Sequence, residues 1–69
     1  MIPDRKGGEE MTLGERMVFY RAKENISQGE LARRCGLSTQ TVNSVENGLQ
    51  SPSKVTLAKI ELVIGKEEE

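Results

Sequence analysis

Residues 27–48 read SQGELARRCGLSTQTVNSVENG and contain two short helical patterns on either side of one glycine. Ser27 and Glu30 have the spacing of a capping box, which predicts a helix over residues 28–35. Gly36 follows the last periodic residue, where a left-handed glycine commonly ends a helix. The inner face of this helix is expected to consist of Leu31, Ala32 and Cys35.

A second helix is predicted directly after the turn. Ser38 is suited to its N-cap, and the helix is expected to run from Thr39 to about Asn47. Val42 and Val45, three residues apart, would form its buried side. A short turn with a glycine between two helices is typical of a helix-turn-helix. Isolated helices of under about 12 residues are marginal in water, so other segments must hold this pair in place.

Two flanking helices are predicted to supply that support. Thr12 and Glu15 form another capping box, at the start of a helix that should run to about Glu24. Ser53 is the expected cap of a fourth helix, which Gly65 would end. No strand-like alternation is present, so the predicted class is all-α with four short helices. The residues expected to face the core from the two flanking helices are Leu13, Met17, Tyr20, Arg21, Leu57, Ile60 and Ile64.

The chain is 69 residues long, which corresponds to one small domain. It contains one Phe, one Tyr and no Trp, so its core must be built mainly from aliphatic side chains. We expect a flexible N-terminal arm over residues 1–10, a helix-turn-helix domain over residues 11–65 and an acidic tail over residues 66–69.

Several functional classes are excluded by what the chain lacks. It contains no histidine and a single cysteine, Cys35, so a His- or Cys-based metal site has no ligand set and Ser-His or Cys-His catalysis has no base. We expect no metal, no cofactor and no enzymatic activity, and no small-molecule ligand because there is no second domain to sense one. No apolar run has the length of a signal peptide or a membrane span, which predicts no membrane association and a cytoplasmic location.

The formal net charge is −1, but it is unevenly distributed along the chain. Residues 16–54 carry +3, whereas residues 1–15 and residues 55–69 each carry −2. For binding a polyanion, the distribution of charge matters more than its total. The centre of the chain therefore favours nucleic-acid binding, although +3 is weak. The adjacent Arg33 and Arg34 indicate either a solvated face or a contact with DNA or a partner.

Residues 13–53, LGERMVFYRAKENISQGELARRCGLSTQTVNSVENGLQSPS, resemble the phage repressor/Cro-like helix-turn-helix domains, also called the XRE family. The resemblance covers roughly residues 12–65 and implies a lambda repressor-like bundle of four to five short helices. A bare helix-turn-helix pattern is a weak signal, but an ordered set of positions over more than fifty residues is specific. That set comprises Arg21, Ser27-Gln28, Leu31-Ala32, Gly36-Leu37-Ser38, Val42, Glu46-Asn47-Gly48 and Pro52.

The resemblance implies that the helix Thr39–Glu46 lies in the DNA major groove as a recognition helix. With Val42 and Val45 facing the core, the outward side chains of this helix are short, polar and uncharged. Gln and Asn can pair bidentately with adenine, and Ser or Thr can bond several bases or pack on the thymine methyl. The alternative is an ordinary solvated polar face. The residues expected to contact bases are Ser38, Thr39, Gln40, Asn43 and Ser44.

Phosphate contacts are expected from the flanks of the recognition helix. The family places such a contact at Gln28, and the backbone N–H groups at that helix start also favour an anion. The loop after the recognition helix contains no Lys or Arg before Lys54, which predicts modest affinity and a shallow salt dependence. The full predicted set is Gln28, Asn47, Gln50, Lys54 and Arg16.

Arg21 falls on a predicted buried stripe, where a guanidinium without a partner would cost several kcal/mol. A carboxylate must therefore meet it. Glu46, near the end of the recognition helix on its inner side, is the predicted partner, and the family resemblance implies the same pair.

The fourth helix has more apolar residues than the core needs. Val55, Leu62 and Val63 cannot all face inward, and we expect them to form a weak homodimer interface unless the N-terminal arm covers them. The predicted function is a sequence-specific DNA-binding transcriptional regulator, a repressor that binds double-stranded DNA at a palindromic operator. The alternative is a protein-interaction module on the same fold, antitoxin-like or an adaptor, in which DNA binding is secondary.

Overall fold

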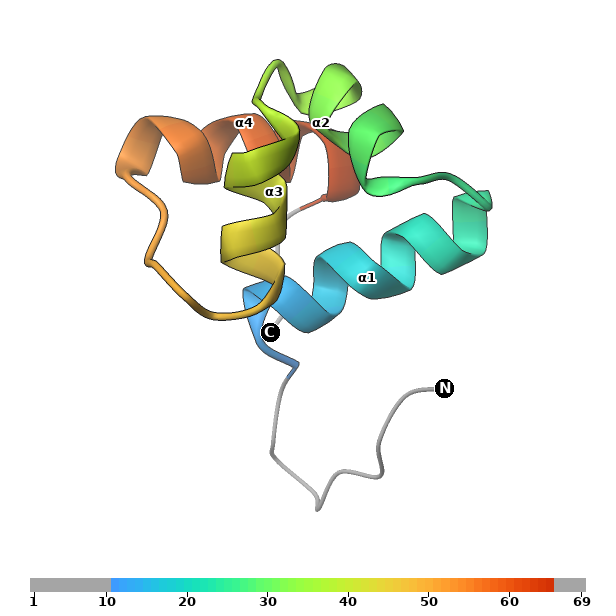
Figure 1. The fold of residues 1–69 in the computed structure, drawn as a ribbon, viewed down its shortest axis with the longest axis horizontal. Coiled ribbons are helices and arrows are strands. Elements are labelled where there is room, and N and C mark those ends of the chain that lie inside the picture. The colour runs from blue at the N-terminus through green and yellow to red at the C-terminus, as the bar shows by residue number, and fades with distance from the viewer. Residues whose placement is uncertain (1–10, 66–69) are drawn as a thin grey trace.

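The computed structural model describes residues 11–65, and within that range it contains four α-helices and no strand (Figure 1). The all-α class predicted from the sequence is confirmed. The predicted N-terminal arm (residues 1–10) and acidic tail (residues 66–69) lie outside the described residues. The helices are α1 (Leu13–Glu24), α2 (Gln28–Cys35), α3 (Thr39–Glu46) and α4 (Lys54–Ile64).

Each helix begins at a hydroxyl side chain that accepts a hydrogen bond from the first turn. Thr12 and Glu15 complete a reciprocal capping box, with hydrogen bonds of 3.1 and 2.9 Å. Ser27 Oγ accepts from the Glu30 N–H at 3.1 Å, but the Glu30 carboxylate turns to two arginines instead of the cap backbone. The predicted second capping box is therefore correct for Ser27 and wrong for Glu30, which does not bond back to the cap residue. Glu30 binds the arginines instead, because charge-assisted hydrogen bonds to guanidinium groups are stronger than one to a neutral N–H. The other two N-caps are Ser38 and Ser53.

The helix ends follow local backbone chemistry. Asn25 and Gly36 end α1 and α2 in the left-handed conformation, with φ of 57° and 73°. After Gly36, the Leu37 N–H donates to the Ala32 carbonyl at 2.9 Å, which closes the turn between α2 and α3. This turn is short, so α3 must start close to where α2 stops.

The core is small and aliphatic, as expected. All four helices contribute to it, and half-buried side chains, including Tyr20, Ile64 and Val63, pack against its edge. Leu57 and Ile64 are half-buried rather than buried, so α4 contributes one fully buried residue where three were expected. The buried hydrophobic residues are Met17, Leu31, Ala32, Cys35, Val42, Val45 and Ile60.

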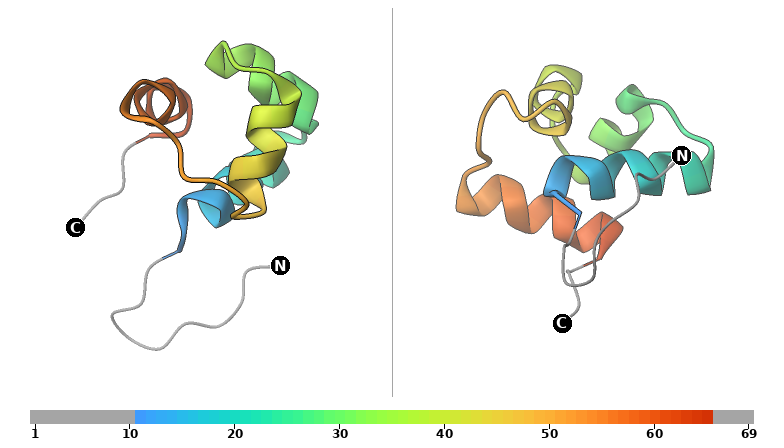
Figure 2. Two further views of the ribbon diagram at one scale, coloured as in Figure 1. Left: turned by 60° about the vertical axis from the view of Figure 1, so that its left-hand side comes forward. Right: turned by 90° about the horizontal axis from the view of Figure 1, so that it is seen from below.

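Helix α3 packs on both α2 and α1, while α4 packs on α2 and α1 from another side (Figures 1 and 2). The contact between the start of α1 and the end of α3 requires Gly14. A Cβ at that position would lie 2.5 Å from the carbonyl oxygen of Glu46 and 2.9 Å from that of Val45. The absence of a side chain at residue 14 therefore sets how closely these two helices approach.

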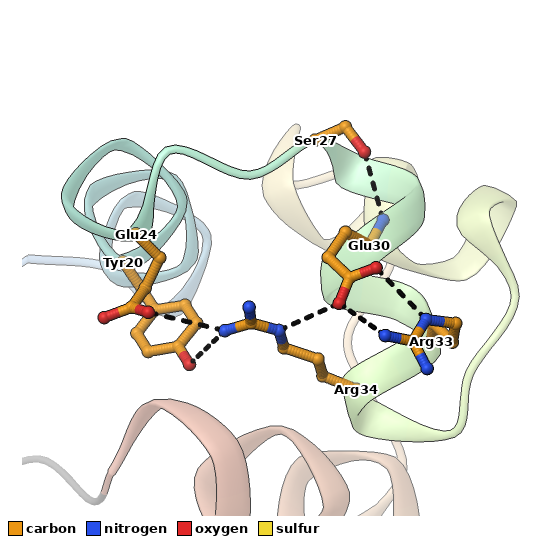
Figure 3. Close-up of polar contacts among 6 residues, drawn as sticks. All are labelled: Tyr20, Glu24, Ser27, Glu30, Arg33 and Arg34. Carbon is orange, nitrogen blue, oxygen red and sulfur yellow. Dashed lines mark hydrogen bonds and ion pairs between the residues drawn. The ribbon is translucent and has the colours of Figure 1, made fainter.

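The corner between α1 and α2 is closed by Arg34 (Figure 3). Its Nη1 donates to the Tyr20 hydroxyl at 3.1 Å and lies 3.5 Å from the Glu24 carboxylate, both on α1. Its Nε donates to Glu30 on its own helix at 3.1 Å, and Glu30 also binds Arg33. These hydrogen bonds, first from Arg33 and then from Arg34, lower the pKa of Glu30. The contacts of Arg34 are thus within the fold rather than with solvent alone.

Candidate nucleic-acid interface

One side of α3 is buried and the other faces outward. Val42 and Val45 belong to the core, and the helix carries no charged side chain except Glu46 at its last position. Thr39, Gln40 and Asn43 are exposed, whereas Ser44 is half-buried. The outward face is therefore a row of uncharged hydrogen-bonding groups, of the kind that can address base edges.

Ser38 is occupied at the start of α3. Its Oγ accepts from the Thr41 N–H at 3.1 Å and donates to Thr41 Oγ1 at 2.9 Å. The hydroxyl hydrogen is therefore used inside the helix cap. Of the five residues expected to contact bases, Ser38 therefore has its hydroxyl engaged within the fold.

Glu46 anchors the inner side of α3 at its C-terminal end. Arg21 binds it in a bidentate manner, with Nε 2.8 Å from Oε2 and Nη2 3.0 Å from Oε1. The carboxylate side chain is 3% exposed and the guanidinium side chain 22% exposed. The hydrogen bonds to Glu46 and its negative charge raise the pKa of Arg21, while burial acts in the opposite direction. The pair fixes the end of α3 to α1.

Gln28 also binds Glu46, a contact that the sequence did not predict. Its Nε2 donates to Glu46 Oε1 at 2.9 Å, and its Oε1 accepts from Asn43 Nδ2 at 3.4 Å. The side chain predicted to contact a phosphate thus also links the buried carboxylate to the outward face of α3. The only sequence signal was the position of Gln28 at the start of α2, which does not reveal what lies opposite.

The other predicted phosphate contacts lie in different parts of the molecule. Asn47, Gln50 and Lys54 are exposed, and Asn47 caps α3 with its Nδ2 3.0 Å from the Asn43 carbonyl. Residues 45–52 also line an open groove with residues 12–15 at the start of α1. Arg16 lies elsewhere, because its guanidinium donates to the Gly65 carbonyl at the end of α4. Arg16 therefore links α1 to the end of α4.

The surface of α4 is only partly as expected. Val55 and Leu62 are 66% and 87% exposed, but Val63 is half-buried and packs against the core. Within residues 11–65, no helix has the length and hydropathy of a membrane span, and no cluster of side chains is arranged to hold a metal ion. Cys35 is buried, which raises the pKa of its thiol.

The helix-turn-helix family HTH_3 matches residues 19–69. A protein named as an uncharacterized HTH-type transcriptional regulator of Methanocaldococcus jannaschii is 36% identical over 50 residues, which cover 72% of this chain and 76% of that protein. No solved structure gives a significant match. The four helices of residues 11–65 have the arrangement described above. Because the family match extends over most of the chain, this protein belongs to the XRE-type helix-turn-helix family HTH_3.

Proposed function

We propose that this protein is a sequence-specific DNA-binding transcriptional regulator that reads the major groove with α3. The observation that carries the proposal is the outward row of Thr39, Gln40 and Asn43 on a helix whose opposite side is buried. The family membership and the relative named as a transcriptional regulator support it. A repressor needs only to occupy its site, and we therefore assign repression rather than activation.

Base readout in this proposal rests on Gln40 and Ser44, assisted by Thr39 and Asn43. Phosphates are contacted from both flanks of α3, which positions the protein without selecting a sequence. The flanking contacts are Gln28 at the start of α2 and, after α3, Asn47, Gln50 and Lys54. Arg16 and Ser38 are not included, because Arg16 donates to the end of α4 and the Ser38 hydroxyl is part of the N-cap of α3.

Two copies are needed for a useful site. One recognition helix contacts only a few base pairs, whereas a two-fold dimer on a palindromic operator reads two half-sites about 34–36 Å apart. The exposed Val55 and Leu62 on α4 are the proposed contact between the copies. The apolar surface is small, so the dimer is expected to be weak without DNA.

Selection from a random duplex library followed by fluorescence anisotropy tests the function. The protein should enrich one short sequence. Gln40→Ala should weaken binding to that sequence by about 5- to 150-fold, which corresponds to about 1–3 kcal/mol, and relax the preference at one base pair. Lys59→Gln, an exposed change on α4, is the control and should change neither the affinity nor the base preference. If no sequence is enriched, or if Gln40→Ala weakens random and selected DNA equally, base readout by α3 is contradicted.

The second candidate is a protein-interaction module on the same fold. It is favoured by the lack of Lys or Arg between α3 and Lys54, which leaves few charges for phosphates. This candidate predicts that DNA affinity stays weak for every duplex, even at low salt. A titration of the selected duplex over a salt series therefore separates the two candidates.

A further inference from the structure

The side-chain amide of Gln28 has an orientation that chemistry dictates. An ionised carboxylate only accepts hydrogen bonds, and Glu46 forms a bidentate ion pair with Arg21. The Gln28 group that lies 2.9 Å from Glu46 Oε1 must therefore be its NH2, Nε2. The carbonyl oxygen of Gln28 is consequently left to face Asn43.

The orientation of the Asn43 amide on α3 follows from that of Gln28. Because Gln28 Oε1 can only accept, the Asn43 group 3.4 Å from it must be the NH2, Nδ2. Within residues 11–65, Asn43 Oδ1 accepts no hydrogen bond, and the residue is exposed. Asn43 therefore presents a hydrogen-bond acceptor on the outward face of α3.

We propose that the ion pair between Arg21 and Glu46, acting through Gln28, fixes the amide of Asn43 with its carbonyl oxygen outward, so that Asn43 selects a base that carries an exocyclic amine. In the major groove those bases are adenine (N6) and cytosine (N4), whereas the groove-facing polar groups of guanine (O6, N7) and thymine (O4) only accept hydrogen bonds. Asn43 is thus a specificity-determining residue, and Gln28 is a positioning residue that acts through it. The inference rests on the proposed function, because it concerns bases read by α3.

Inversion of the Asn43 amide is resisted at a buried contact rather than at the surface. If Asn43 turned its oxygen inward, Gln28 would have to turn as well, or two carbonyl oxygens would face each other. A turned Gln28 would place its own carbonyl against the Glu46 carboxylate, whose side chain is 3% exposed. Two acceptors in contact at a buried charge are costly. An isolated surface asparagine would have no such restriction.

The base pair read by Asn43 is found by measuring affinity for every single-base variant of the selected sequence, with the full chain and with Asn43→Ala. The position whose preference is lost in Asn43→Ala is the one that it reads. We expect adenine or cytosine on the strand facing Asn43. If no sequence is enriched, the proposed function fails and the inference fails with it. If a sequence is enriched but Asn43→Ala alters no position, the inference alone fails.

Two further variants test the amide orientation. Asn43→Asp loses the hydrogen bond to Gln28 but has an acceptor oxygen at both positions, so it still presents an acceptor outward and should retain the same preferred base, while its charge lowers affinity for all sequences. Gln28→Met releases the amide and should reduce the preference at that position by about 3- to 10-fold, the effect of one hydrogen bond, with no change at the pair read by Gln40. Gln50→Met, a glutamine outside this set of contacts, should weaken all sequences alike.

Specific results of these experiments would contradict the inference. A guanine or thymine at the Asn43 position overturns the inference, as does an inverted preference in Asn43→Asp. An unchanged preference in a folded Gln28→Met protein, checked by thermal unfolding, removes Gln28 from its positioning role. Because Asn43 is exposed, Asn43→Asp should fold normally and remains informative if Gln28→Met does not.

Discussion

Glu46 is the residue on which the geometry of α3 depends most. Three hydrogen bonds, two from Arg21 and one from Gln28, converge on its carboxylate. They bring residues from α1 and α2 to the last turn of α3. A domain of this size is stabilised by only roughly 3–10 kcal/mol in total, so one buried pair is a large part of what keeps the helix in place.

Loss of Arg21 should therefore be severe. Arg21→Met leaves the Glu46 carboxylate buried without its cation, and we expect the free energy of unfolding to fall by about 3–5 kcal/mol. Urea denaturation of the two proteins measures this. Arg33→Met is the matched control, because the Arg33 side chain is 76% exposed and its solvent-screened pair with Glu30 should contribute little to stability. Equal losses in the two variants would contradict the assigned role of the buried pair.

Gly14 gives a second test at the scale of one residue. Alanine is the better helix former by about 1 kcal/mol, but here its Cβ would meet the backbone carbonyls at the end of α3. We expect Gly14→Ala to destabilise the protein by about 1–3 kcal/mol in thermal unfolding. Gly29, also the second residue of its helix, has no atom closer than 3.7 Å to an added Cβ. Gly29→Ala should be neutral or stabilising, and a stable Gly14→Ala protein would show that α1 and α3 can separate without cost.

These residues also show where sequence reasoning stops. An arginine on an apolar stripe was sufficient to demand a carboxylate, and Glu46 was the acidic residue on the inner side of α3. Nothing in the sequence gives the separation of α1 and α3, so the need for Gly14 was missed. The contact between Gln28 and Asn43 was missed for the same reason, because it joins two helices across the turn.

At the scale of the helices, the boundaries were predictable because capping is local. Thr12, Ser27, Ser38 and Ser53 each bond to an N–H three residues ahead, and a pattern this short can be recognised without tertiary information. The exception was Glu30. Its carboxylate has three possible sets of donors within four residues, and which set it binds depends on charge as well as spacing.

The arginine contacts of Glu30 make the stability of α2 depend on pH. The folded-state pKa of Glu30 lies below the ordinary value of 4.5, chiefly because of hydrogen bonds from Arg33 and then Arg34. The pairing therefore stabilises the fold above about pH 4.5, and this contribution is lost as the pH falls through the lowered pKa. We expect Glu30→Gln to reduce the fall in unfolding midpoint over that acidic range, measured by circular dichroism.

The double variant Arg33→Gln/Arg34→Gln is the control for this pH effect. It keeps Glu30 but removes the two groups that lower its pKa, so it should show the same reduced acid dependence as Glu30→Gln. An acid limb that is identical in the unaltered protein and both variants would mean that other carboxylates account for the loss of stability.

At the scale of the whole molecule, the inner and outer surfaces of α4 were harder to assign. Its sequence is apolar on several sides, and periodicity alone could not decide which residue faces the core. Ile60 is buried, Val63 packs at the edge of the core, and Leu57 is half-buried. The direction of the helix is set by its contacts with α1 and α2, which no local pattern contains.

The exposed part of α4 leads to a prediction on assembly. Analytical ultracentrifugation with a palindromic duplex should give two chains per duplex, and Leu62→Glu should reduce this to one at the same protein concentration. A carboxylate in each copy would face apolar surface and its counterpart in the other copy. Phe19→Glu, a comparable change on the exposed side of α1, is the control and should leave two chains bound. One chain per duplex at saturation, with Leu62→Glu unchanged in affinity, would exclude the dimer.

The division of α3 into a buried side and an outward side has a consequence for redesign. Val42, Val45 and Glu46 hold the helix, whereas Thr39 and Gln40 make none of the side-chain hydrogen bonds found among residues 11–65. A library in which only these two positions vary should therefore yield proteins of nearly constant melting temperature and diverse target sequences. Asn43 stands apart, because replacing it also disturbs a network that reaches Arg21, and new specificities there would have to be selected jointly with position 28.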